Sequence, residues 1–214
     1  QVEIRNMQMQ MLESMVDTHR KQVEKDPGNA QSLQDLAKAL FEYAMLNKRD
    51  QAQVLLLEGV QVIQKSISIS DESAAQWVKA VLLQAQSHAE LDGGKAATLQ
   101  TQATSVFNSV LAKEADSTRK QALQKEQELL QGTMKAWVEE MQKTDSPEQR
   151  AAAAKAAPAP APTGASAARG LGAAPQGPAG SGKAGDGDMT GFVVLVAGAV
   201  VIGGLVWYFS QKKK

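Results

Sequence analysis

Residues 29–63, NAQSLQDLAKALFEYAMLNKRDQAQVLLLEGVQVI, decide the fold of this chain. Apolar residues recur three and four positions apart in the first part, which predicts a helix from about Ala30 to Met45. The polar turn Asn47-Lys48-Arg49 follows, and a second helix begins after it. Because the turn is short, the two helices are expected to pack as an antiparallel pair. The apolar positions of the pair are Leu33, Leu36, Ala37, Leu40 and Ala44, then Ala52, Leu56, Gly59, Val60, Ile63 and Ile67.

Helical periodicity continues on both sides of this pair. A helix from about Val2 to Glu24 is predicted to stop at Asp26-Pro27-Gly28. A fourth helix starts at Asp71-Glu72, and we expect Asp92-Gly93-Gly94 to end it. A fifth helix carries Leu99, Ala103, Phe107, Val110 and Leu111. A sixth, capped by Asp116-Ser117, carries Leu123, Leu130, Met134, Trp137, Val138 and Met141. Residues 1–145 are therefore predicted to form an all-α domain.

The helices contain an imperfect internal sequence repeat. Large and small residues pair as Leu33 with Ala37 and Ala52 with Leu56, and this pattern returns as Trp77 with Val81 and Ala103 with Phe107. A large residue on one helix that meets an alanine and a large residue on the next is typical of tetratricopeptide repeats. Leu33 and Trp77 are 44 residues apart, longer than the usual repeat of about 34. We expect a short tetratricopeptide-like array with a concave face.

The C-terminal end contains one long apolar run. Residues 192–209, FVVLVAGAVVIGGLVWYF, are 18 residues without a charge, which as a helix would span about 27 Å of a hydrocarbon core of about 30 Å. Aromatic rings and lysines at its end suit the headgroup level. The sequence predicts a single-pass tail anchor within residues 189–214, with the N-terminal domain in the cytosol. The anchor residues are Phe192, Trp207, Tyr208, Phe209, Lys212, Lys213 and Lys214.

Residues 146–188 change in composition to alanine, proline, glycine and serine. Such a segment has little apolar surface to bury, so we expect a flexible linker between the domain and the anchor. Ser146-Pro147 is a typical helix start, which allows a short alanine helix to about Ala157.

Composition argues against several classes of function. Residues 1–150 carry 17 Lys and Arg against 21 Asp and Glu, a net charge of −4, so a nucleic-acid partner is not expected. The chain has no cysteine, which excludes thiolate chemistry and disulfides. His19 and His88 fall on different helices and are expected to be partly buried rather than catalytic. We expect no enzyme, no cofactor and no metal.

The first helix is rich in methionine. Met7, Met9, Met11 and Met15 are flexible apolar side chains that suit either a peptide groove or packing against the second helix. Packing is the favoured interpretation.

Three stretches carry a resemblance to a known family. They are Asn29-Ala30-Gln31-Ser32-Leu33, Trp77 near the start of the fourth helix, and the stretch from Ala103 to Val110. With the layout of repeats, linker and anchor, the chain resembles the plant-type twenty-kilodalton receptor subunit of the mitochondrial outer-membrane protein translocase. The likeness covers about residues 8–140 and the tail, and the sixth helix matches poorly. The resemblance implies a receptor for presequences of precursor proteins, placed on the mitochondrial outer membrane with other translocase subunits and membrane lipid as partners.

The expected groove would take the apolar side of an amphipathic peptide. Its candidate residues come from the inner helices, with Asp35 and Glu42 as acids on the rim. An organelle adaptor that binds a folded partner in fission or assembly, or a plastid-envelope protein, is the alternative. The candidate peptide-binding residues are Leu33, Leu40, Phe41, Trp77, Val81 and Gln84.

Overall fold

The structure is a computed structural model, and it describes residues 2–156 of the chain. The predicted membrane span 192–209, its flanking lysines and most of the predicted linker lie outside the described residues. Within residues 2–156, no helix has both the length and the apolarity needed to cross a bilayer.

The described part of the chain is all-helical, as predicted. It contains helices and no strand, and most helix ends fall within a few residues of the sequence-based expectation. The helices are α1 (Val2–Lys25), α2 (Ala30–Leu46), α3 (Arg49–Ile69), α4 (Ser73–Ala89), α5 (Gly93–Lys113), α6 (Ser117–Thr144) and α7 (Pro147–Ala156).

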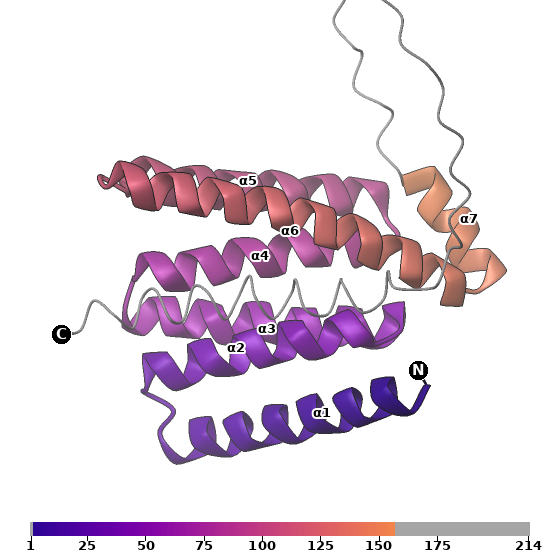
Figure 1. Cartoon of the computed structure of the whole chain (residues 1–214), viewed down its shortest axis with the longest axis horizontal. Helices are drawn as coiled ribbons and strands as arrows, with labels where there is room; N and C mark the ends of the chain where they lie inside the picture. Colours follow the sequence, from indigo (N-terminus) through magenta and orange to yellow (C-terminus); the bar gives the residue numbers. More distant parts are fainter. Residues whose placement is uncertain (1, 157–214) are drawn as a thin grey trace, which may run out of the picture.

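Helices α1–α5 form a stack in which successive helices run antiparallel (Figure 1). The closest pairs are α2 with α3 and α4 with α5, and α1 packs on α2 in the same way as α3 packs on α4. Gly59 of α3 allows part of this packing, because a Cβ there would lie 2.9 Å from Cδ2 of Leu82 on α4. The two helix pairs therefore meet closely at this glycine.

Short side chains define where the helices begin. The carboxamide of Asn29 accepts a hydrogen bond from the backbone N–H of Ser32, and the carboxylate of Asp116 accepts from Thr118 and Arg119. These caps satisfy N–H groups that have no partner within the helix.

The prediction that Asp92-Gly93-Gly94 ends the fourth helix was wrong. Helix α4 ends earlier, at Ala89, and Asp92 is the N-cap of α5, accepting from the N–H of Lys95. Glycines often end a helix, but here the capping carboxylate of Asp92 in front of them starts the next one.

One continuous apolar core joins helices α1–α6. Trp77 of α4 is at its centre and meets Phe107 of α5 edge to face, with ring centroids 4.8 Å apart. The predicted pairing of these two helices through large residues is therefore observed.

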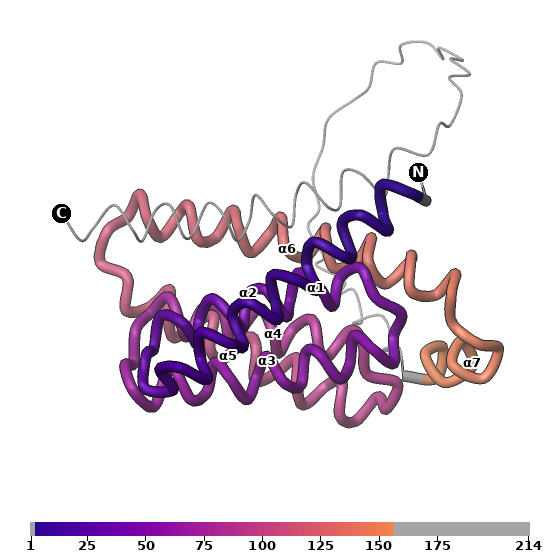
Figure 2. Tube along the Cα trace, turned by 90° about the horizontal axis from the view of Figure 1, so that it is seen from below, coloured from indigo at the N-terminus to yellow at the C-terminus, as the bar shows by residue number. Residues whose placement is uncertain are grey.

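Helix α6 lies outside the layer of stacked helices and runs along it (Figure 2). Its inward side packs mainly against α4. Five of its apolar side chains are buried: Leu123, Leu130, Met134, Trp137 and Met141.

The folded body extends to Ala156, eleven residues past the predicted boundary at residue 145. Helix α7 contacts α5 and begins with a reciprocal cap, in which the N–H of Gln149 donates to Ser146 Oγ at 3.2 Å and the N–H of Ser146 donates to Gln149 Oε1 at 2.8 Å. The short helix expected after Ser146-Pro147 is confirmed, and it belongs to the body.

Candidate functional site

The six residues predicted to line a peptide groove are all in the core. Leu33, Leu40, Phe41, Trp77, Val81 and Gln84 each have an exposed fraction of 3% or less. They come from α2 and α4, as expected, and of the six only Gln84 lines a pocket, the one between α4, α5 and α6 described below. Two reasons account for their burial. The α2 residues are enclosed by the stack, and α4 is covered by α6.

An acidic side chain is buried where α6 covers α4. Glu126 of α6 lies against Trp77, and burial raises the pKa of this carboxyl group to about 8, an effect that the Trp77 indole partly offsets. The Oε1 atom of Glu126 is buried without a hydrogen bond within 3.5 Å. A carboxyl group in an apolar seam is costly when it is charged, so this half of α6 is held less favourably than its apolar residues suggest.

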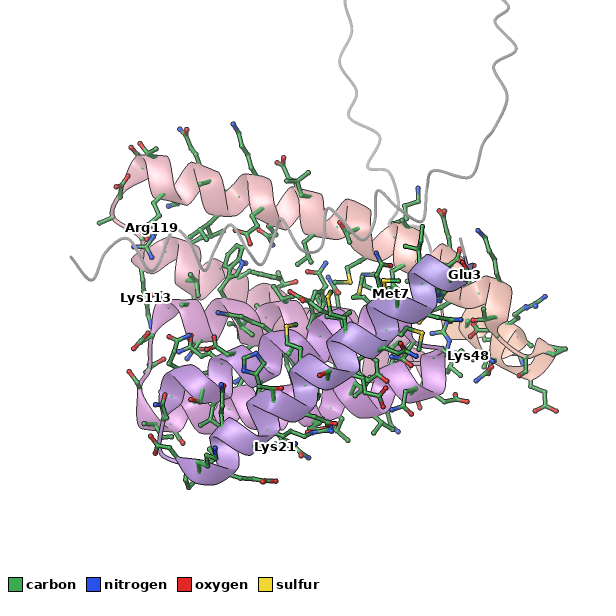
Figure 3. All side chains as sticks on the ribbon, turned by 60° about the horizontal axis from the view of Figure 1, so that its bottom comes forward. Glu3, Met7, Lys21, Lys48, Lys113 and Arg119 are labelled. Atoms are coloured by element: carbon green, nitrogen blue, oxygen red, sulfur yellow. The ribbon has the colours of Figure 1, made fainter. Side chains whose placement is uncertain are left out.

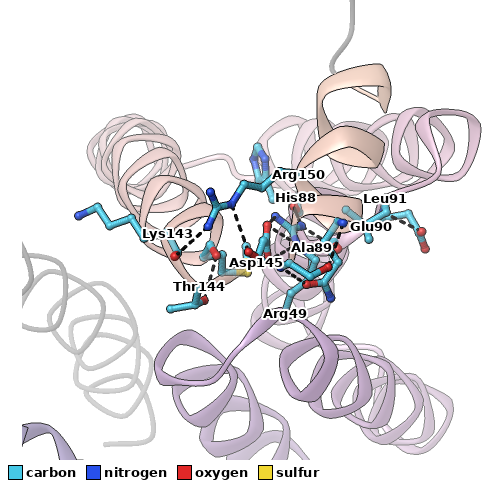
Figure 4. A network of polar contacts seen from close by, with 12 residues as sticks. Arg49, His88, Ala89, Glu90, Leu91, Lys143, Thr144, Asp145 and Arg150 are labelled. Carbon is cyan, nitrogen blue, oxygen red and sulfur yellow. Dashed lines mark hydrogen bonds and ion pairs between the residues drawn. The ribbon is translucent and has the colours of Figure 1, made fainter.

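The other end of α6 is fixed by a buried polar network (Figure 4). The guanidinium of Arg49, at the start of α3, donates to both carboxylate oxygens of Asp145, at the end of α6. Its Nη1 also donates to the carbonyls of His88 and Ala89, at 3.2 and 3.0 Å. These carbonyls belong to the last turn of α4, so Arg49 joins three helices.

An apolar stripe on α1 remains exposed. Ile4, Met7 and Met11 are 54%, 69% and 62% exposed, and they follow one another three and four residues apart on one side of the helix. Leu12 and Val16, on a neighbouring side, are buried against the stack. Core packing, the interpretation favoured for these methionines, was wrong for Met7 and Met11, whereas Met9 and Met15 are half-buried.

Helix α6 comes near the N-terminal end of α1, where the stripe begins. Arg5 of α1 lies 3.8 Å from Glu140 of α6, Nη1 to Oε1, and is on the side of α1 that also carries Leu12 and Val16. Figure 3 labels Met7 on this N-terminal stretch of α1. We call Ile4, Met7 and Met11, which lie near the end of α1 that approaches α6, the α1/α6 surface.

Two of the predicted rim residues form a half-buried charged row on α2. Asp35, Lys38 and Glu42 lie on the side of the helix opposite Leu33 and Leu40. Burial raises the pKa of the Glu42 carboxyl group, which Lys38 partly offsets, and burial lowers the pKa of Lys38, which Asp35 and Glu42 partly offset. The row therefore carries two carboxylates to one ammonium group.

A pocket of about 340 Å³ lies between α4, α5 and α6, lined mostly by the carbon atoms of polar side chains. His88 is half-buried in its wall, and burial lowers the pKa of the imidazole. His19, on α1, is also half-buried, as predicted, and its Nδ1 lies 3.0 Å from Gln22 Oε1. Within residues 2–156, no three His, Cys, Asp or Glu residues are grouped so as to hold a metal ion. The pocket is lined by Gln84, His88, Gln100, Gln131, Lys135, Val138 and Glu139.

Sequence reasoning missed the α1/α6 surface although a signal was present. Ile4, Met7 and Met11 follow a helical spacing of their own, offset from the stripe of Leu12 and Val16. Two apolar stripes on one helix indicate two partners. The stack accounts for one of them.

In comparisons with known proteins, no family model, no curated protein and no solved structure matches the chain.

Proposed function

We propose that this chain is a tail-anchored receptor of the mitochondrial outer membrane, which binds amphipathic targeting presequences of precursor proteins on the α1/α6 surface. The stack α1–α5 serves as a tetratricopeptide-like scaffold, and residues 192–209 anchor it with the domain in the cytosol. The observation that carries the proposal is the exposed stripe Ile4, Met7 and Met11, near the end of α1 that approaches α6.

The stack already accepts one amphipathic helix. Helix α6 packs mainly on α4 and buries Leu130, Met134 and Trp137, while its outer side is polar except for Leu129. A presequence has the same construction, and the α1/α6 surface offers it methionine side chains. Because these are flexible, they adapt to apolar residues of different shapes.

Charge supports the same class of ligand. Presequences are basic, and the described surface has half-buried carboxylates on α2 at Asp35 and Glu42. Burial raises the pKa of the Glu42 carboxyl group, and Lys38 offsets this only in part. A cationic side chain nearby would stabilise the charged form of Glu42.

The affinity should be micromolar or weaker. A short helix offers a few leucine-sized side chains, each worth about 1.5–3 kcal/mol when fully buried, and ordering the peptide costs much of this gain. A dissociation constant of 1 μM corresponds to about −8 kcal/mol. Weak binding also suits a receptor that must release its cargo.

The test is titration of presequence-type peptides into residues 2–156, followed by backbone amide signals. Amide shifts should concentrate on α1 and the facing side of α6. Replacing the peptide leucines with alanine should abolish binding, while raised salt should weaken it modestly, since exposed charges are screened within about 8 Å.

A matched pair of variants locates the site. Met7→Ser combined with Met11→Ser should weaken peptide binding at least about tenfold, which is about 1.4 kcal/mol. Val54→Ser combined with Leu57→Ser changes two exposed apolar residues on α3 and should leave binding unchanged. Equal effects of the two double variants would remove the α1/α6 surface from the proposal.

An adaptor for a folded partner is the competing function. The exposed pair Val54 and Leu57 on α3 favours it, because they offer apolar area away from α6. Tight binding of one folded protein that the α3 double variant abolishes, with no response to several presequences, would establish the adaptor and exclude the receptor.

A further inference from the structure

No segment among residues 2–156 covers the α1/α6 surface. Its three apolar side chains, Ile4, Met7 and Met11, are each more than half exposed, and exposed apolar stripes of this kind mark sites of interaction. The same chain contains an apolar segment that also needs cover, residues 192–209, with 18 uncharged residues in sequence. Before this segment reaches a bilayer, water is an unfavourable environment for it.

We infer that the α1/α6 surface holds residues 192–209 of the same chain until this segment enters a membrane. The inference rests on the proposed function, because it uses the same surface. It adds regulation of that surface: the tail of the same chain occupies the receptor site before insertion, and the site becomes free for presequences afterwards.

Residues 157–191, which connect α7 to the apolar segment, are numerous enough to reach the α1/α6 surface, and α7 lies at the same end of the molecule as the start of α1. Helix α7 begins seven residues after Glu140, which contacts Arg5 on α1, and Figures 1 and 2 place α7 and the start of α1 at the same end of the molecule. Residues 157–191 number 35, and if they form the flexible linker that the composition predicts, a chain of that length would have a root-mean-square span of roughly 30–35 Å. The tail therefore reaches the surface without rearrangement of the stack.

The two partners also fit in shape. The segment has small residues in its middle, Ala197-Gly198-Ala199 and Gly203-Gly204, which permit close approach of another helix. Met7 and Met11 supply long, unbranched side chains that fill such irregular spaces. Contact through a few side chains is weak enough for a bilayer to displace it.

The absence of cysteine from the chain provides a clean test. The full chain is synthesised without membranes, with Met7→Cys and Ala199→Cys, and the rate of intrachain disulfide formation under mild oxidant is measured at high dilution. The control carries Leu57→Cys, an exposed site on α3, with the same Ala199→Cys. We expect the Met7 pair to form its disulfide at least about tenfold faster, because docking raises the local concentration of the tail thiol.

A second arm adds vesicles of phosphatidylcholine and phosphatidylserine before oxidation. Insertion should slow the Met7 pair to the rate of the Leu57 pair. Equal rates of the two pairs without vesicles, a disulfide mainly between two chains, or a Met7 rate that vesicles leave unchanged would each overturn the inference.

The two proposals fail separately. Presequence binding to residues 2–156 together with equal disulfide rates removes the tail inference and leaves the receptor. Fast disulfide formation at Met7, relieved by vesicles, without any presequence binding supports tail docking and removes the receptor.

Discussion

The guanidinium of Arg49 and the carboxylate of Asp145 form a buried ion pair between residues 96 positions apart, with Nη2 2.8 Å from Oδ2 and side-chain exposures of 2% and 1%. Arg49 also donates to the last carbonyls of α4. A single side chain thus ties the end of α6 to the beginning of α3 and the end of α4.

Asp145→Ala should lower the free energy of unfolding by about 3–5 kcal/mol, because it leaves the Arg49 charge buried without its counterion. Urea denaturation of residues 2–156 measures this. Glu140→Gln is the matched control, since Glu140 is also an α6 carboxylate paired with an arginine but is 46% exposed; it should cost less than about 1 kcal/mol. Similar losses for both variants would mean that the buried pair has no special role.

Glu126 should make the stability of the domain depend on pH. Its pKa is about 8 in the folded chain and 4.5 ordinarily. Between these values the unfolded chain loses a proton that the folded chain keeps, so stability falls as pH rises from about 4.5 to about 8.

Glu126→Gln should flatten this slope and raise the melting temperature at about pH 8. Thermal melts across the range test it, and Glu128→Gln, at an exposed position two residues on, is the control that should keep the slope. An unchanged slope in Glu126→Gln would show that Glu126 is not the titrating group.

Two helical glycines should respond oppositely to alanine. Gly132 in α6 has nothing within 4 Å of an added Cβ, so Gly132→Ala should stabilise by about 0.5–1 kcal/mol through helix propensity. At Gly59 the added Cβ would meet buried Leu82 at 2.9 Å, and overpacking typically costs about 1–3 kcal/mol. Gly59→Ala should therefore be the less stable variant in urea denaturation. Equal gains would show that α3 and α4 separate easily.

Removing residues 189–214 should release the protein from membranes. The reason is that the uncharged run 192–209 falls within the removed part. Carbonate extraction of cell membranes should find the full chain in the pellet and the shortened chain in the supernatant. A chain lacking residues 160–180 of the linker is the control and should remain in the pellet. An N-terminally tagged chain, imaged in cells, separates the mitochondrial from the plastid surface.

The helices were predictable because their signals are local. The spacing of Leu33, Leu36 and Leu40 and the caps Asn29 and Asp116 depend on neighbours within a turn or two, so sequence reasoning placed these helices correctly. The end of α4 was misplaced for the same local reason, since Asp92 before two glycines fits a stop and a start equally well.

The site could not be read in the same way. Apolar periodicity marks the side of a helix that is buried, so it selected Trp77 and Val81, which the structure places in the core. Whether such a side faces a ligand or another helix depends on where α6 lies, and that is fixed by Arg49 and Asp145 across 96 positions. No local sequence pattern near Arg49 or Asp145 predicts that the two residues form an ion pair.

The capped helix α7 has a mechanical consequence. Among the described helices α7 is the nearest to the C-terminal end, and it is bound to the body by Gln149 to Asp50 at 2.7 Å and Arg150 to the Asp145 carbonyl at 3.1 Å. If the proposed anchor holds the chain at residues 192–209, a pull from that side would reach the ten residues of α7 before the Arg49–Asp145 ion pair. Helix α7 would then unfold first and spare the stack behind it.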